Sequence, residues 1–299
     1  MTFTALLIKE MRLRMRRERT IWLIVAYILL LGLLGWLNVS VSSAGANNSG
    51  NWGNIGLGLY SLLLIVQLFL ILFITPAFTS TAINGEKERQ TFDLLLCSNL
   101  SATALITGKL LAGLINALLL IAASIPIFSL VFFFGGVSPI QALQALLVFV
   151  LTAMLAASLG IFCSTLVARP AISTALSYVL LLLWLGLPVL LAIIVPRSVQ
   201  TGPPGASPDM PIYLNWHPVI ALLNTYNYGG FIGNNTAMFV LFRMPVWLMY
   251  CIFSCIAILI FIALSLWLVK PQGWNRLKQR LHKNHSLNEK HETKASVTT

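Results

Sequence analysis

The residues best suited to ionic chemistry gather in one short segment between two long apolar stretches. Residues 86–89 are four consecutive charges, Glu-Lys-Glu-Arg, and Thr91 follows them as a plausible N-cap of a short helix. Phe92 and Leu95 would give that helix an apolar side, and Asp93 lies near its positive end. A small charged helix beside apolar stretches offers a surface that a soluble partner could bind.

Residue patterns that would support catalysis are missing from the sequence. It contains no GxxxxGK[ST] phosphate-binding loop, no HExxH motif and no GxSxG motif. Cys251 and Cys255 share a face of an apolar stretch, where thiols usually act as small apolar fillers. His282, His285 and His291 lie close together near the C-terminus, but no second cluster supplies further metal ligands. We therefore expect no enzymatic activity, metal or cofactor in this chain.

Composition and charge placement indicate a membrane protein. Of 299 residues, 58% are hydrophobic and 9% are charged, whereas a soluble domain carries about 25% charged residues. The net charge of +11 would suit nucleic acid, but the charges flank four long stretches that contain no Asp, Glu, Lys or Arg. A membrane-spanning helix needs about 20 apolar residues. We predict an all-α integral membrane protein with six spans near 20–37, 57–83, 104–134, 140–167, 171–195 and 246–269.

The charge-free stretches also restrict the class of transporter. Proton-coupled and sodium-coupled transporters commonly use acidic or basic side chains inside the membrane as relays. The four stretches offer none, which argues against a self-powered secondary transporter and against most membrane enzymes.

The distribution of Lys and Arg predicts the orientation. With six spans, seventeen of the nineteen basic residues fall on one side, and only Arg197 and Arg243 fall on the other. Because basic residues concentrate in cytoplasmic loops, we expect both termini to lie in the cytoplasm of a cell whose plasma or inner membrane holds the protein.

The two ends of the chain carry most of these charges. Phe3, Leu7, Met11 and Met15 recur every four residues, which predicts a basic amphipathic N-terminal helix rather than a cleaved signal peptide. This helix could bind anionic headgroups or serve only as a topology anchor. We expect residues 1–270 to form one membrane domain and residues 271–299 to form a basic cytoplasmic tail, partly disordered.

The charged segment resembles the coupling region of permease subunits of type-2 ABC transporters, an exporter-like family. That family has an acidic-basic cluster, a Gly-Thr pair, an apolar helix and a Ser-Pro or similar turn, followed by a Gly-Lys pair that enters the third span. Gln90 and Asn99 stand where the family usually has glycine and proline. The residues that match are Glu86, Glu88, Thr91, Leu94, Leu95, Ser98, Leu100, Gly108 and Lys109.

The resemblance implies a function and a set of partners. Such permeases dimerise with an identical or related protomer and dock on separate ATPase subunits, which hold the ATP and Mg²⁺. Closure of those subunits would push the coupling segment and reorient the bundle. Glu86 and Glu88 could then pair with Arg12 or Arg16. The coupling residues implied are Glu86, Lys87, Glu88, Arg89, Thr91, Phe92, Asp93, Leu95, Gly108 and Lys109.

The sequence gives weaker evidence for a transport pathway than for the coupling segment. Gln67, Asn116 and Gln144 are polar residues within the predicted spans. They could line a pathway between two protomers, or they could form hydrogen bonds between helices, each worth about 0.6 kcal/mol in membranes. The loop over residues 196–243 could form a short re-entrant or surface helix that closes an outer gate, or it could rest on the headgroups as a loop. A channel, a secondary transporter and a non-transporting scaffold are the alternatives to a permease.

Overall fold

A computed structural model describes residues 18–45, 52–88, 102–194, 212–226, 236–239 and 242–269. The predicted amphipathic N-terminal helix, the part of the charged segment from Arg89 to Ser101, and the basic tail lie outside the described residues. The possible partners Arg12 and Arg16 lie outside them as well.

Six helices in the described part are long and apolar enough to cross a membrane, which confirms the predicted all-α membrane fold. Each consists of a long, nearly continuous apolar run, whose side chains suit lipid. Its helical backbone satisfies its own hydrogen bonds, as a medium without water requires. The six are α2 (Glu18–Gly45), α3 (Trp52–Thr79), α6 (Ala102–Phe134), α7 (Pro139–Leu166), α8 (Pro170–Ile194) and a last helix over Val246–Val269.

Shorter elements connect these helices. At one end α4 (Asn84–Glu88) follows α3, and the turn between α7 and α8 lies nearby; we call this the charged end. The other end, the hairpin end, holds the α6–α7 turn and the small elements of the long loop. These are η2 (Ile212–Trp216), α9 (Pro218–Thr225), β1 (Thr236–Phe239) and β2 (Phe242–Pro245), of which the last two pair in antiparallel fashion.

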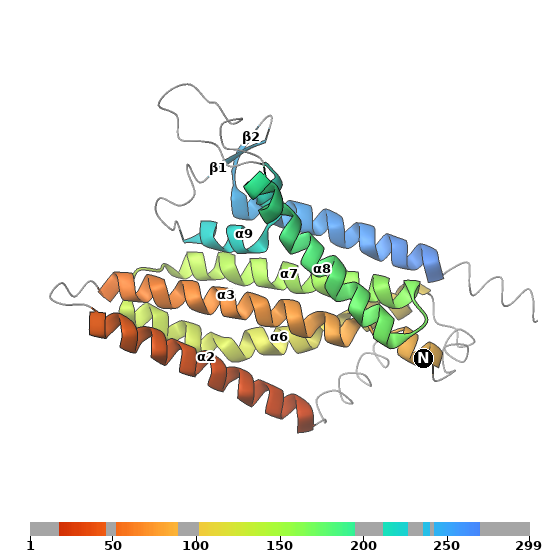
Figure 1. Cartoon of the computed structure of the whole chain (residues 1–299), viewed down its shortest axis with the longest axis horizontal. Helices are drawn as coiled ribbons and strands as arrows, with labels where there is room; N and C mark the ends of the chain where they lie inside the picture. Colours follow the sequence, from red (N-terminus) through yellow and green to blue (C-terminus); the bar gives the residue numbers. More distant parts are fainter. Residues whose placement is uncertain are drawn as a thin grey trace, which may run out of the picture.

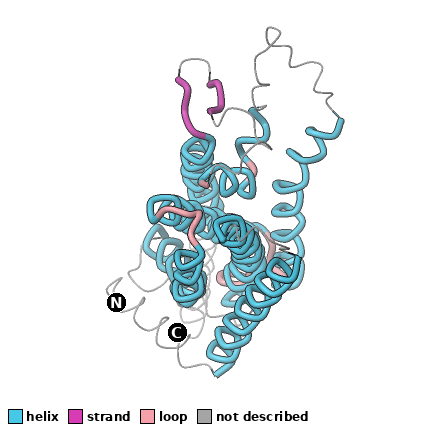
Figure 2. The backbone as a smooth tube through the Cα atoms, turned by 90° about the vertical axis from the view of Figure 1, so that its left-hand side faces the viewer, coloured by secondary structure: helices cyan, strands magenta, loops and turns pink. Residues whose placement is uncertain are grey.

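The helices surround α7, the most buried of the six. Figure 1 shows α3, α6 and α7 side by side, with α2 and the last helix at opposite margins and α8 crossing obliquely. Viewed after a quarter turn, the long helices form one bundle (Figure 2). In α7, 67% of the most apolar window is buried, against 50% in α3 and 17% in both α2 and α8. The outer helices therefore present most of their apolar surface away from the protein, as lipid-facing helices do.

The α6–α7 turn depends on glycine at two consecutive positions. Gly135 and Gly136 have φ of 79° and 91°, a region that other residues rarely adopt. A Cβ on Gly56 of α3 would lie 2.2 Å from the Gly135 carbonyl oxygen. The turn thus rests directly on the first residues of α3. Ser138 then begins α7 with a capping box in which its hydroxyl accepts from the Gln141 amide.

The long loop folds back against the bundle. Ala221 and Leu222 of α9 are buried in the main hydrophobic core, and Tyr226 packs edge-on against Tyr60 of α3 with ring centroids 5.3 Å apart. Burial lowers the pKa of His217, which keeps the imidazole neutral at neutral pH. The predicted short helix is present as α9, packed against α7 and α3. The two-stranded ribbon β1–β2 was not predicted.

The end of α3 is wedged between two glycines of neighbouring helices. A Cβ on Gly113 of α6 would lie 2.3 Å from Thr79 Cγ2, and a Cβ on Gly160 of α7 would lie 2.1 Å from Thr79 Oγ1. Both distances are far below van der Waals contact. Small residues at helix crossings allow such close approach in membranes, where packing drives association. Thr79 therefore fixes the end of α3 between α6 and α7.

We predict that Gly113→Ala destabilises the bundle by roughly 1–3 kcal/mol, the usual cost of overpacking. Thr79→Ala should rescue it, because the new methyl group would then meet only Thr79 Cβ, at 3.6 Å. The same change should rescue Gly160→Ala less well, because there the distance to Thr79 Cβ is 3.0 Å. Thermal unfolding in detergent micelles measures all three effects.

Gly186→Ala in α8 provides the matched control, since a Cβ there has no atom within 4 Å. It should leave the melting temperature unchanged or raise it slightly, because alanine has the higher helix propensity. Equal melting temperatures for Gly113→Ala and the wild-type protein would show that the crossing is not tight.

Candidate functional site

A serine of α7 holds the start of α4 in place. After α3 ends, residues 80–83 form a turn that leads into the five-residue α4. The Ser164 hydroxyl oxygen accepts hydrogen bonds from the backbone amides of Ile83 and Asn84, at 2.9 and 3.1 Å. The first amides of a helix have no partner within it and are usually capped by a nearby side chain. Here the cap comes from a different helix, far away in the sequence.

Two further hydrogen bonds tie the same segment to α7 and α8. Lys87 Nζ donates to the carbonyl oxygen of Thr165 at 3.3 Å, within the last turn of α7, where a positive charge is favourable. The Ser173 hydroxyl of α8 donates to the carbonyl oxygen of Ser80 at 2.8 Å. The turn and α4 are thus bound to two helices besides the one that precedes them.

An ion pair adds a third connection, to α6. Lys109 Nζ contacts Glu86 Oε1, and the Lys109 side chain is only 7% exposed. A buried ammonium group is costly without a partner, so the two charges constrain each other's position. Lys109 lies in the second turn of α6, and Ile106 beside it packs with Ile83 in one apolar cluster. The polar contacts of α4 therefore lie beside a buried apolar cluster that includes Ile83 and Ile106.

The structure brings together some of the residues singled out in the sequence. Glu86, Lys87 and Lys109 meet at this site, Glu88 is exposed in the last turn of α4, and Gly108 is buried beside Lys109. The other predicted coupling residues lie outside the described part of the chain: Arg89, Thr91, Phe92, Asp93 and Leu95.

Sequence reasoning missed the hydroxyl groups of α7 and α8 that complete the site. Ser164 and Ser173 are both fully buried, but each lies in a charge-free apolar stretch that contains at least one other serine. Only their nearness to Arg169, which marks the turn between the two helices, hinted that they lie at the charged end.

The polar residues proposed for a pathway lie apart from this site. Gln67 of α3 is fully buried, and neither amide atom has a hydrogen-bond partner within the described residues. Asn116 of α6 is buried and Gln144 of α7 is half-buried. Their role in a pathway stays a prediction. Among the described residues no three His, Cys, Asp or Glu side chains are grouped so as to hold a metal ion.

Comparison with known families decides the class of this protein. A family model described as ABC-2 family transporter protein matches residues 37–269. The chain belongs to the ABC-2 transporter family. This confirms the resemblance seen in the charged segment, and all described residues of the site lie within the matched range. No curated protein matches the sequence significantly. The family consists of membrane permeases, so this ABC-2 protein is a multi-pass permease of an ABC transporter.

We predict that Ser164→Ala loosens α4, because two buried backbone amides would lose their hydrogen-bond acceptor. Each unsatisfied amide should destabilise the folded position of α4 by roughly 1–3 kcal/mol. Hydrogen exchange followed by mass spectrometry should show faster exchange for residues 83–88, by about tenfold for each 1.4 kcal/mol lost.

Ser158→Ala is the matched control on the same helix. The Ser158 hydroxyl is also buried, but it donates to Leu155 O within α7, so its loss leaves no other element without a partner. Exchange in residues 83–88 that is equally fast in both variants would contradict the capping role of Ser164.

Proposed function

We propose that this ABC-2 permease is the membrane-spanning half of an ATP-driven exporter and that α4 and the residues after it receive the force from a separate ATPase subunit. The observation that carries this proposal is the set of side-chain contacts that bind α4 to α6 and α7 at once. A surface contact point that is also tied to several spans suits a coupling element.

The need for a partner follows from the sequence. The chain has no phosphate-binding loop. Its four charge-free stretches carry no relay residue, and the buried Lys109 near the start of α6 is paired with Glu86 at the charged end. Energy for transport must therefore come from another subunit, which would bind the ATP and Mg²⁺. A second permease protomer, identical or related, would complete the membrane part.

The contacts support a simple transmission route. If an ATPase subunit displaces α4, the Ser164 cap and the Lys87 bond pull on the end of α7. The Glu86–Lys109 pair pulls on the start of α6. Ser173 passes the movement to α8 through the Ser80 carbonyl. Because Thr79 is wedged between α6 and α7, these helix ends would move as one unit.

The charged end would face the cytoplasm, where the ATPase subunits have access to ATP. This orientation agrees with the excess of Lys and Arg in the segments that join the helices at that end. Both termini would then be cytoplasmic, and the hairpin end would face outwards across the plasma or inner membrane.

Co-purification tests the proposal. We expect the protein, extracted from native membranes in mild detergent, to retain a stoichiometric soluble subunit with a phosphate-binding loop. Glu88 is exposed in the last turn of α4, so Glu88→Lys should reduce the retained subunit by about tenfold, equivalent to about 1.4 kcal/mol. The melting temperature of the permease should stay unchanged.

Arg169→Glu is the control, because it changes an exposed charge at the same end by an equal amount outside α4. It should leave most of the ATPase subunit bound. A stable native complex without any ATPase would overturn the proposed function, and equal losses in the two variants would place the docking surface elsewhere.

A further inference from the structure

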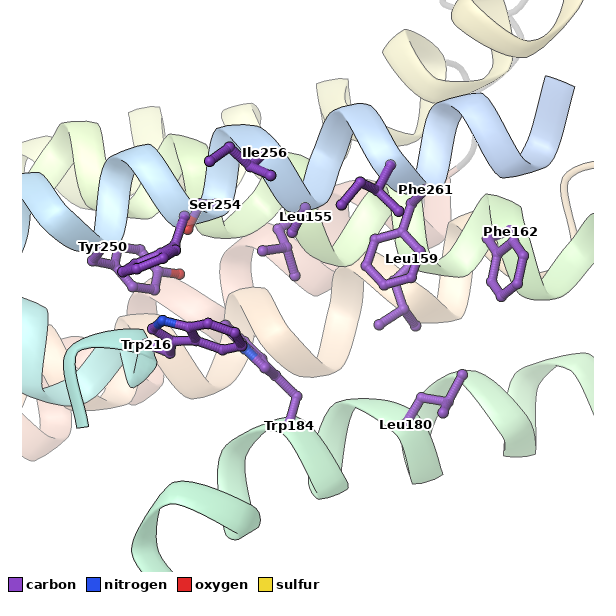
Figure 3. Close-up of a pocket in the computed structure, with 13 residues that line it drawn as sticks. Leu155, Leu159, Phe162, Leu180, Trp184, Trp216, Tyr250, Ser254, Ile256 and Phe261 are labelled. Carbon is purple, nitrogen blue, oxygen red and sulfur yellow. The ribbon is translucent and has the colours of Figure 1, made fainter. Parts of the chain in front are cut away.

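A cavity lies beside α7, outside the charged segment. It occupies about 560 Å³ between α7, α8, the last helix and η2. In Figure 3, Trp184 of α8 and Trp216 of η2 lie at one end of the cavity, and Phe162 lies at the other. Pockets that bind small molecules usually measure roughly 300–1,000 Å³, so this cavity is large enough to hold a ligand.

The wall of the cavity is almost entirely hydrocarbon. None of its thirteen lining residues is charged. Apart from the aromatic residues Trp184, Trp216 and Tyr250, only Ser254 has a polar side-chain atom. The Tyr250 hydroxyl group already shares a hydrogen bond of 2.7 Å with Thr152. Apolar cavities do not hold water, because a bound water needs two to four polar partners. The lining therefore selects an apolar occupant.

The floor of the cavity is buried, whereas its rim opens on the side of the bundle. Leu155 and Leu159 on α7 are 4% and 3% exposed. Ile256 and Ile260 on the last helix also line the cavity but are 49% and 52% exposed. These rim residues belong to a helix that is apolar enough to span the membrane. The mouth of the cavity therefore faces the hydrocarbon of the bilayer.

The length and ends of the cavity indicate how an occupant would lie. Its lining on the last helix runs from Tyr250 to Phe261, about 16 Å at 1.5 Å per residue. That is close to half of the roughly 30 Å hydrocarbon core, the depth of one leaflet. Trp216, 48% exposed at the hairpin end, has an indole of the kind that favours the headgroup region.

We propose that this cavity binds the hydrocarbon chain of an amphipathic molecule that enters sideways from the bilayer, with its polar end beside Trp216. The proposal requires only that the bundle lies in a membrane. It does not depend on an ATPase partner, so it can fail or succeed independently of the proposed coupling.

Photolabelling tests this site. The protein would be reconstituted in vesicles of phosphatidylethanolamine and phosphatidylglycerol whose acyl chains carry a diazirine. After irradiation, mass spectrometry of the digested protein locates the attached lipid. We expect label on Leu155 and Leu159, which surrounding lipid cannot reach because they are buried. Label confined to exposed residues such as Leu29 and Leu33 of α2 would show surrounding lipid only and would overturn the proposal.

Filling the cavity should remove the label. Ala257 lines the cavity, whereas Ala263 on the same helix is exposed outside it. Ala257→Phe should reduce labelling of Leu155 and Leu159 by about tenfold, equivalent to about 1.4 kcal/mol, and Ala263→Phe should leave it unchanged. Unchanged labelling in Ala257→Phe, with a wild-type melting temperature, would overturn the proposal.

A second pair of variants covers the case in which Ala257→Phe does not fold. Ile260→Trp enlarges an exposed residue at the mouth, and Leu259→Trp makes the same kind of change at a neighbouring exposed residue outside the cavity. Only the first should block labelling of the floor. Crosslinks from the floor to a second protein chain in place of lipid would show that a protein fills the cavity, which would also overturn the proposal.

Discussion

The close approach of three helices at Thr79 is the constraint on which the charged end depends. Gly113 and Gly160 leave room for the Thr79 side chain and nothing larger, so α3 ends at a fixed point between α6 and α7. The chain must then turn within a few residues, and the backbone amides of the buried Ile83 and Asn84 need partners within the protein. Ser164 supplies the acceptor for two of them. The position of α4, and with it the Glu86–Lys109 pair, follows from this packing.

The two proposed sites share one helix and differ in chemistry. At the charged end, the last turn of α7 offers a serine hydroxyl and free helix carbonyls, which suit backbone amides and a lysine. Farther along, Leu155 and Leu159 of the same helix form the floor of the hydrocarbon cavity. Because α7 is the most buried of the six spans, a displacement of its end would also shift the neighbouring helices that line the cavity. In the proposed transporter, α7 is thus the physical link between the coupling segment and the lipid-facing pocket.

Several features could be predicted because they depend on local composition. The charge-free stretches indicated six spanning helices, since crossing the membrane requires only length and apolarity. The predicted spans 104–134 and 140–167 also left the α6–α7 turn between them, where Gly135 and Gly136 end a long apolar run. The ribbon β1–β2 was missed, since it forms within a loop whose sequence carries no regular alternation. Pro76, Pro126 and Pro188 lie inside helices, where neighbouring groups can donate to the carbonyl oxygens that proline leaves free. Near Pro76, Tyr178 of α8 donates to the Phe73 carbonyl oxygen at 2.7 Å.

The sequence by itself determined that this chain is a helical membrane protein with a charged segment between its second and third spans, because hydropathy and charge are properties of each residue. It also marked Glu86, Lys87 and Lys109 as members of one motif. Only the tertiary structure decided that Glu86 pairs with Lys109, that Lys87 reaches Thr165, and that Ser164 caps α4. These contacts join residues that are distant in sequence, and their partners are chosen by which helices pack together. The cavity beside α8 could likewise not be predicted from the sequence, because a gap between helices depends on the shapes of surfaces that meet only in the folded protein.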